Sequence, residues 1–253
     1  MTVTLCRVRT VAYMRNVLHG SYAYLELGAC MVAWLPLLAV AYLRHRHDPV
    51  PRIEGRWMRR FARVTTRLSG MWRFSVEGEA PADIGTHAYV VVANHVSTAD
   101  PFLLSFLPWD MRWVAKEELF RIPLTGWLLR LSGDIPLRRG NGESVKEMMA
   151  MCRATLAAGL PVMLFPEGTR SPDGSLRCFK DGAFRLAIET QVPVLPIAIE
   201  GTRDCRPKGS WWFGRARAKA RILSPVPTCG LGAGDVARLR EAVRGQIAAA
   251  QAS

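Results

Sequence analysis

The chain has 253 residues, of which 49% are hydrophobic and 22% are charged. These values exclude a disordered or low-complexity chain, and the length suits one α/β domain with a small addition. Lys and Arg exceed Asp and Glu by 13 charges, which indicates a polyanionic partner such as nucleic acid or an anionic membrane surface.

The positive charge is concentrated in two segments. The first basic segment, residues 44–73, carries nine Arg against two acidic residues. The second basic segment, residues 203–221, carries seven Lys or Arg against one acidic residue. The rest of the chain is balanced, so the excess predicts two basic patches.

An uncharged apolar run covers residues 27–43 and is followed directly by the first basic segment. A bilayer requires about 17–25 such residues, and neighbouring Lys and Arg mark the cytoplasmic side. We therefore favour a membrane segment over a buried core helix, with the rest of the chain on the cytoplasmic face (of the inner membrane in a bacterium). Pro36 should kink or split the helix, and both a spanning segment and a re-entrant hairpin fit the run.

Apolar residues recur at helical spacing through the first basic segment. They are Trp57, Met58, Phe61, Val64, Leu68 and Trp72. The pattern fits an amphipathic helix at the lipid interface or an ordinary surface helix. We thus expect a membrane-anchoring helical region at residues 1–73 and an α/β domain at residues 74–253.

From Tyr89 onward, short apolar runs alternate with longer mixed segments. Predicted strands are Tyr89–Ala93, Arg112–Ala115, Pro161–Phe165, Val194–Ile199 and Ala218–Leu223. Predicted helices are Pro101–Phe106, Glu143–Ala158, Ala183–Thr190 and Asp235–Ala250. This alternation predicts an α/β fold, with a mostly parallel central sheet flanked by helices.

His95 follows the first of these predicted strands, and Asp100 comes five residues later. Ligands of parallel sheets bind at the carboxyl ends of strands. An imidazole there could remove a proton from a hydroxyl, and a carboxylate could fix its tautomer. In the alternative interpretation, Ser97, Thr98 or Asp100 caps a helix and His95 is an ordinary loop residue.

Three other polar blocks follow predicted strands or turns. In residues 165–171, Gly168 permits close backbone approach, Arg170 could hold a phosphate or carboxylate, and Glu167 could orient Arg170 or accept from a substrate hydroxyl. The alternative there is a polar surface turn. Residues 133–139 offer two adjacent Arg, and residues 115–119 offer Lys116.

Five sequence blocks between about Tyr89 and Ile199 resemble the 1-acylglycerol-3-phosphate acyltransferase family. In chain order they are His-x4-Asp, AKEEL, GDIPLRR, FPEGTRS and the VPVLPI run. The resemblance implies transfer of a fatty acyl group from acyl-CoA or acyl-carrier protein to the sn-2 hydroxyl of 1-acylglycerol-3-phosphate, giving phosphatidic acid. It implies His95 and Asp100 as the catalytic pair. It further implies an acceptor site formed by Lys116, Arg139, Glu167, Gly168, Thr169 and Arg170, with the neighbouring Arg138 outside the motif.

The chemistry of the residues agrees with that activity. A thioester is already activated, so the protein requires a base, cations for the phosphate and donors for the oxyanion. No metal or redox cofactor is expected, and the absence of a G-x-S-x-G elbow argues against a serine hydrolase.

The second basic segment contains three aromatic residues, Trp211, Trp212 and Phe213. Aromatic and basic side chains together favour an anionic phospholipid surface, although a solvated loop is the simpler alternative, and the charge could also attract the acyl donor. Three other functions stay open: acylation of another lyso-lipid such as a lyso-aminolipid, nucleic-acid binding, and a catalytically inactive lipid-binding scaffold. Nucleic-acid binding leaves the His-Asp and FPEGTRS blocks without a role, and we expect no nucleic-acid partner.

Overall fold

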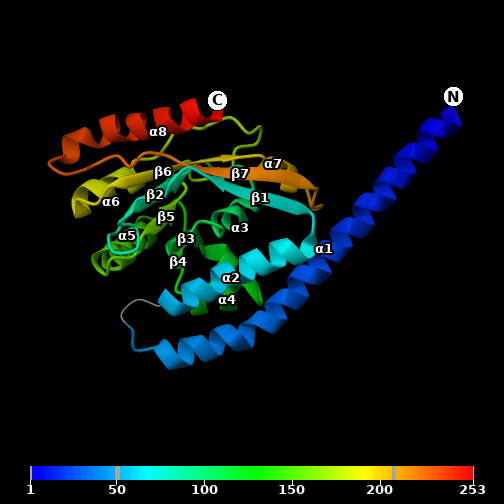
Figure 1. Ribbon diagram of the computed structural model, residues 1–253, viewed down its shortest axis with the longest axis horizontal. Helices are drawn as coiled ribbons and strands as arrows, with labels where there is room; N and C mark the ends of the chain where they lie inside the picture. Colours follow the sequence, from blue (N-terminus) through cyan, green and yellow to red (C-terminus); the bar gives the residue numbers. More distant parts are fainter. Residues whose placement is uncertain (1, 49–51, 207–208, 253) are drawn as a thin grey trace.

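A computed structural model describes residues 2–48, 52–206 and 209–252, with side chains described from residue 20 onward. Pro207 and Lys208 of the second basic segment lie outside the described residues. Two helices, α1 (Thr2–His45) and α2 (Arg52–Ser69), precede the sheet. Figure 1 shows α2 and the C-terminal part of α1 on the side of the sheet opposite helix α8 (Val236–Ala252).

Within the described ranges, seven strands form one sheet in the order β1-β7-β6-β2-β5-β3-β4 (Figure 1). Neighbouring strands are parallel except β6 and β7, which are antiparallel. The mostly parallel sheet expected from the sequence is therefore confirmed. The strands are β1 (Trp72–Glu77), β2 (Val90–Ala93), β3 (Arg112–Lys116), β4 (Ile135–Leu137), β5 (Val162–Leu164), β6 (Val194–Glu200) and β7 (Ala216–Ile222).

Helices follow the strands as the alternating pattern predicts. The α-helices of the sheet region are α3 (Asp100–Leu104), α4 (Thr125–Leu131), α5 (Gly142–Ala157), α6 (Gly182–Thr190), α7 (Thr202–Cys205) and α8, with short 3-10 turns η1 (Glu117–Arg121) and η2 (Ala233–Asp235). β1, β4, α4 and α7 were not expected. β1 begins at Trp72 and pairs with β7, so Trp72 belongs to the sheet and not to the preceding helix.

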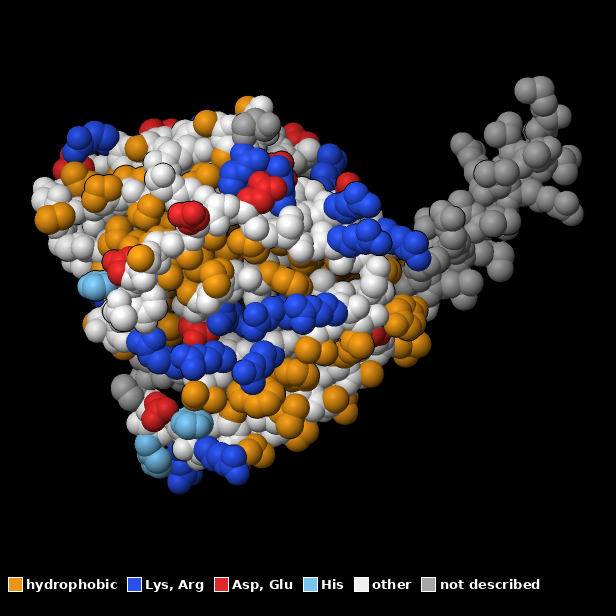
Figure 2. Space-filling model, viewed as in Figure 1, with side chains coloured by type: hydrophobic (Ala, Val, Ile, Leu, Met, Phe, Trp, Pro, Cys, Tyr) orange, Lys and Arg blue, Asp and Glu red, His pale blue; other side chains and the backbone are white. Residues whose placement is uncertain are grey.

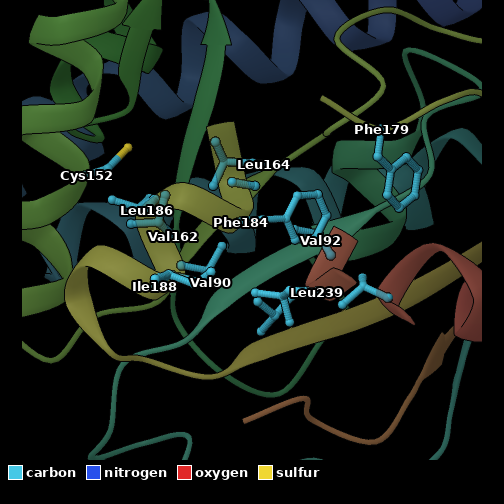
Figure 3. Close-up of a cluster of buried hydrophobic side chains, with 14 of the residues drawn as sticks. Val90, Val92, Cys152, Val162, Leu164, Phe179, Phe184, Leu186, Ile188 and Leu239 are labelled. Atoms are coloured by element: carbon cyan, nitrogen blue, oxygen red, sulfur yellow. The ribbon is translucent and has the colours of Figure 1, made fainter. Parts of the chain in front are cut away.

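The core has one layer on each face of the sheet because successive strand residues point to opposite sides. Val90 and Val92 of β2 join Phe184 of α6 and Leu239 of α8 in one cluster (Figure 3). Val91 joins a second cluster with residues of α3 on the other face. Burial on both faces explains why the central strands read as continuous apolar runs.

Within the described residues, one helical stretch, Gly20–His45 of α1, is long and apolar enough to cross a membrane by length and composition. Large side chains of this stretch remain exposed, including Leu25 at 75% and Leu43 at 62%. Such exposure argues against the helix being an ordinary core helix, which would be buried. Figure 2 shows hydrophobic side chains over this part of α1, beside rows of Lys and Arg over α2.

The helix α1 continues through Pro36, so the split, one of the two outcomes expected there, does not occur. Trp34 and Leu38, on either side of Pro36, both pack in a cluster with Phe61 of α2 and Leu128 of α4. These contacts hold the helix on both sides of the proline and offset its missing hydrogen bond. The same packing shows that part of the apolar face of α2 contacts α1 and α4.

Candidate active site

The predicted polar blocks lie at one edge of the sheet. β2, β5, β3 and β4 are parallel neighbours, so their carboxyl ends meet at the same edge. His95 follows β2, the PEGTR turn (residues 166–170) follows β5, Lys116 ends β3, and Arg139 follows β4. Chain segments separated by up to 75 positions are therefore gathered at the place where parallel sheets bind ligands.

His95 and Asp100 form a hydrogen-bonded pair. The ring nitrogen Nδ1 of His95 lies 2.7 Å from Oδ2 of Asp100. The same Oδ2 accepts from the backbone N–H groups of Val96 (2.8 Å) and Ser97 (3.0 Å), and Asp100 is fully buried. A buried carboxylate in this position fixes a proton on Nδ1 and leaves Nε2 able to accept one.

The helix cap of the alternative interpretation does not lie at Ser97, Thr98 or Asp100. The N-cap of α3 is Ala99, whose side chain makes no capping hydrogen bond. Ser97 Oγ donates to the carbonyl of Arg206 and accepts from Ala99 N–H. Asp100, the first residue of α3, directs its carboxylate to the imidazole instead of capping the helix.

The PEGTR turn and the residues on either side of it contact His95 at three points. The backbone N–H of His95 donates to Oε1 of Glu167 (2.8 Å), and the carbonyl of His95 accepts from the N–H of Ser171 (2.8 Å). Its ring stacks on Phe165, with centroids 4.1 Å apart. Because both backbone groups and the ring are fixed, the imidazole is preorganised relative to the turn.

Glu167 is almost entirely buried, and burial raises the pKa of its carboxyl to about 7. The group binds its proton more tightly in the folded protein than in the unfolded chain. Its contribution to stability is therefore greatest at low pH and is lost as the pH rises from about 4.5 to about 7.

Replacing Glu167 by Gln should remove this pH dependence, because the amide does not ionise and can still accept from His95 N–H. We expect the melting temperature of the variant minus that of the wild type to be larger at pH 8 than at pH 5. Thermal unfolding at both values measures it, with the exposed Glu143→Gln as control. Parallel profiles for Glu167→Gln and the wild type would show that Glu167 does not titrate in this range.

Gly168 adopts a left-handed conformation with φ of 71°, which favours glycine. The side chain of Lys180 occupies the space beside it: a Cβ on Gly168 would lie 2.9 Å from Lys180 Cε. Lys180 is thus a cation at the turn that sequence reasoning missed. Thr169 and Arg170 complete the turn before Ser171.

Arg138 and Arg139 are adjacent in sequence but differ in environment. Arg138 binds both carboxylate oxygens of Glu117, at 2.5 and 2.8 Å. These contacts hold the pKa of Glu117 down at about 2. Arg139 makes no such bond with any of the described residues, which supports the choice of Arg139 over Arg138 for substrate. Lys116 pairs with Glu118 at 2.9 Å.

Arg170 lies in a positive environment. Burial, followed by the charges of Arg206 and Arg139, lowers the pKa of its guanidinium, while Asp100 acts in the opposite direction. Arg139, which the sequence assigns to the same site as Arg170, is thus one of the charges that act on it. Arg206 was not expected there.

Asn94 is a further residue whose role the sequence did not indicate. Its amide nitrogen donates to the carbonyl of Ile199 (2.9 Å), and its Oδ1 accepts from the N–H of Ile199 (2.7 Å). The pair ties the end of β2 to β6, immediately before His95. An asparagine at a strand end was the sole sequence signal available.

A small cavity of about 100 Å³ lies between α1, α2, β1 and α3. Its wall includes Thr98 of the His95 loop, Arg206 and several apolar side chains: Ala23, Leu27, Met71, Trp72, Phe102 and Phe213. Within the described part of the chain, no group of three or more His, Cys, Asp or Glu could hold a metal ion.

The sequence region that contains this site matches a known protein family. The model of the acyltransferase family matches residues 73–200, which include β2, β5, β3, β4 and every predicted site residue. The chain belongs to the acyltransferase family. The family resemblance inferred from the sequence blocks is thereby confirmed.

Individual relatives of this chain are 1-acyl-sn-glycerol-3-phosphate acyltransferases. A chloroplastic 1-acyl-sn-glycerol-3-phosphate acyltransferase of Brassica napus is 32% identical over 187 residues, covering 72% of this chain and 54% of that protein. The alpha form of Ovis aries is 38% identical over 158 residues, covering 62% and 55%. This chain spans about half the length of these curated relatives.

A solved structure in the family has a similar fold over nearly its whole length. The crystal structure of the 1-acyl-sn-glycerophosphate acyltransferase from Thermotoga maritima is 28% identical, with a TM-score of 0.75. The match covers 95% of this chain and 98% of that one. The predicted fold class is thus confirmed by a family member.

Proposed function

We propose that the protein transfers a fatty acyl group from an acyl thioester to the sn-2 hydroxyl of 1-acylglycerol-3-phosphate (lysophosphatidic acid), forming phosphatidic acid. One observation carries this proposal. His95 and the fully buried Asp100, with Nδ1 and Oδ2 2.7 Å apart, lie at the same sheet edge as Arg139 and Arg170. The names of the relatives support the acceptor.

In this mechanism, Asp100 accepts the Nδ1–H of His95, and Nε2 removes the proton from the acceptor hydroxyl. The hydroxyl oxygen then attacks the thioester carbonyl carbon and forms a tetrahedral oxyanion. Collapse of this intermediate restores the carbonyl and expels the thiolate, which takes the proton from the imidazolium. The buried carboxylate stabilises the imidazolium while it exists.

The cations place the acceptor. Arg139 and Arg170 bind the glycerol phosphate, since a guanidinium can make two parallel hydrogen bonds to phosphate oxygens. Lys116 contributes a further charge at the end of β3. Glu167 has a positioning role through the backbone of His95, while Gly168 allows close approach of the turn.

The donor is an acyl-CoA or an acyl-carrier protein, and the chemistry requires no metal or redox cofactor, because the thioester already supplies the activated acyl group. Both donors are anionic at neutral pH. The two basic segments would attract either donor.

We further propose that the protein works on an anionic membrane, with its catalytic site on the cytoplasmic face and residues 1–73 as the anchoring region. The exposed apolar side chains of Gly20–His45 and the neighbouring Arg-rich helix α2 support this location. The purified protein should float with vesicles containing phosphatidylglycerol. Failure to float would contradict the membrane location.

The identity of the acceptor can be tested by competition between two lyso-lipids. Purified full-length protein is given acyl-CoA with equal amounts of lysophosphatidic acid and a lyso-aminolipid, and the products are identified by mass spectrometry. We expect phosphatidic acid as the main product. Preferential acylation of the lyso-aminolipid would overturn the acceptor assignment while leaving acyl transfer intact.

A further inference from the structure

Arg206 lies beside the candidate site although it belongs to none of the sequence blocks. It follows α7 directly, more than 30 positions after Arg170. Its carbonyl accepts a hydrogen bond of 3.0 Å from Ser97 Oγ, and Ser97 is fully buried. The segment after α7 is therefore attached to the loop that carries His95 and Asp100.

Neighbouring groups define the position of the Arg206 side chain. Its Nε donates to the carbonyl of Ser210 (3.1 Å), and its guanidinium carbon lies 5.4 Å from the centre of the Phe213 ring. Phe213 in turn contacts the rings of Tyr24 and Trp72. Together with Thr98, Arg206 lines the cavity between α1 and α3. The guanidinium is thus half-buried and held at the wall of this cavity.

Hydrogen bonds attach the segments that carry Arg206 and Arg170 to the same loop: the carbonyl of Arg206 accepts from Ser97, and Ser171, which follows Arg170, donates to the carbonyl of His95. After burial, the charge of Arg206 is the largest cause that lowers the pKa of Arg170, ahead of Arg139. Gathering like charges costs free energy that a bound anion would offset. A phosphate monoester, which carries nearly two negative charges at neutral pH, would remove that repulsion on binding.

We propose that Arg206 is a third guanidinium for the acceptor's phosphate, acting with Arg139 and Arg170. The inference rests on the proposed function and adds a binding residue to its site. A phosphate group could also reach Arg206 from the acyl-CoA donor, and separate KM values for the two substrates distinguish these sources.

The test compares Arg206→Ala and Arg206→Gln with Arg217→Ala in the full-length protein. Arg217 is an exposed residue of β7 in the same basic segment, so its replacement removes the same charge elsewhere. We expect both Arg206 variants to raise the KM for lysophosphatidic acid about tenfold, with kcat and the KM for acyl-CoA within about twofold of wild type. Arg217→Ala should match the wild type.

Two results would overturn the inference. They are an unchanged KM for lysophosphatidic acid in the Arg206 variants, and a rise confined to the KM for acyl-CoA. If the alanine variant does not fold, as judged by circular dichroism, the glutamine variant decides, because it removes the charge and keeps part of the aliphatic stem. Wild-type protein that acylates no lysophosphatidic acid would instead refute the proposed function.

Discussion

Replacing His95 by Ala should lower kcat for acylation of lysophosphatidic acid about a thousandfold, within the range of about 10²–10⁴ for loss of a general base. The KM values should change little, because the imidazole acts on the hydroxyl proton and not on the phosphate. Steady-state kinetics of the purified variant measure both. The fold should survive, since His95 bonds to Glu167 and Ser171 through its backbone.

The matched control is His87→Ala. His87 is an exposed histidine whose Nδ1 lies 3.5 Å from Asp83 Oδ2, so it reproduces the His–Asp contact away from the sheet edge. It should retain wild-type kcat. A folded His95→Ala variant with near-normal turnover would exclude His95 as the base.

Replacing Arg170 or Arg139 by Ala should weaken the binding of the acceptor. Each Ala variant should raise the KM for lysophosphatidic acid roughly 10- to 100-fold, because a hydrogen bond to a charged group contributes about 1.5–3 kcal/mol. The kcat at saturating acceptor should fall much less. Initial rates over a range of acceptor concentrations separate the two effects.

Arg138→Ala is the control for this pair of variants. It removes the same charge from the position next to Arg139. The guanidinium of Arg138, however, forms an ion pair with Glu117 and is not assigned to the substrate phosphate. Its KM for lysophosphatidic acid should stay within about twofold of wild type. If Arg138→Ala raised the KM and Arg139→Ala did not, the assignment of the two arginines would have to be exchanged.

The fold was predictable where burial on both faces left a continuous apolar run, as at Val90–Ala93 and Val194–Glu200. β1 was missed because its alternating Trp72, Phe74 and Val76 follow directly on a helical pattern of apolar and basic residues. β4 is three residues long and contains Pro136, so it gives almost no periodic signal.

The part of the site that depends on residues close together in the sequence was predictable. Asp100 reaches His95 across a five-residue turn, a contact that depends on nearby chain alone. The contacts of His95 with Glu167 and Phe165 depend on β2 pairing with β5, which are separated by about 70 residues. Arg206 directly follows α7, which comes after yet another strand, β6. Such long-range contacts follow from sheet order, which composition and spacing do not specify.

Release of free thiol from acyl-CoA tests the central claim most directly, because it reports the bond that the proposed reaction breaks. Wild-type protein should release thiol in step with phosphatidic acid when lysophosphatidic acid is present, and almost none without it. The His95→Ala variant should release little in either case. Equal thiol release with and without the acceptor would contradict acyl transfer to the lysophospholipid.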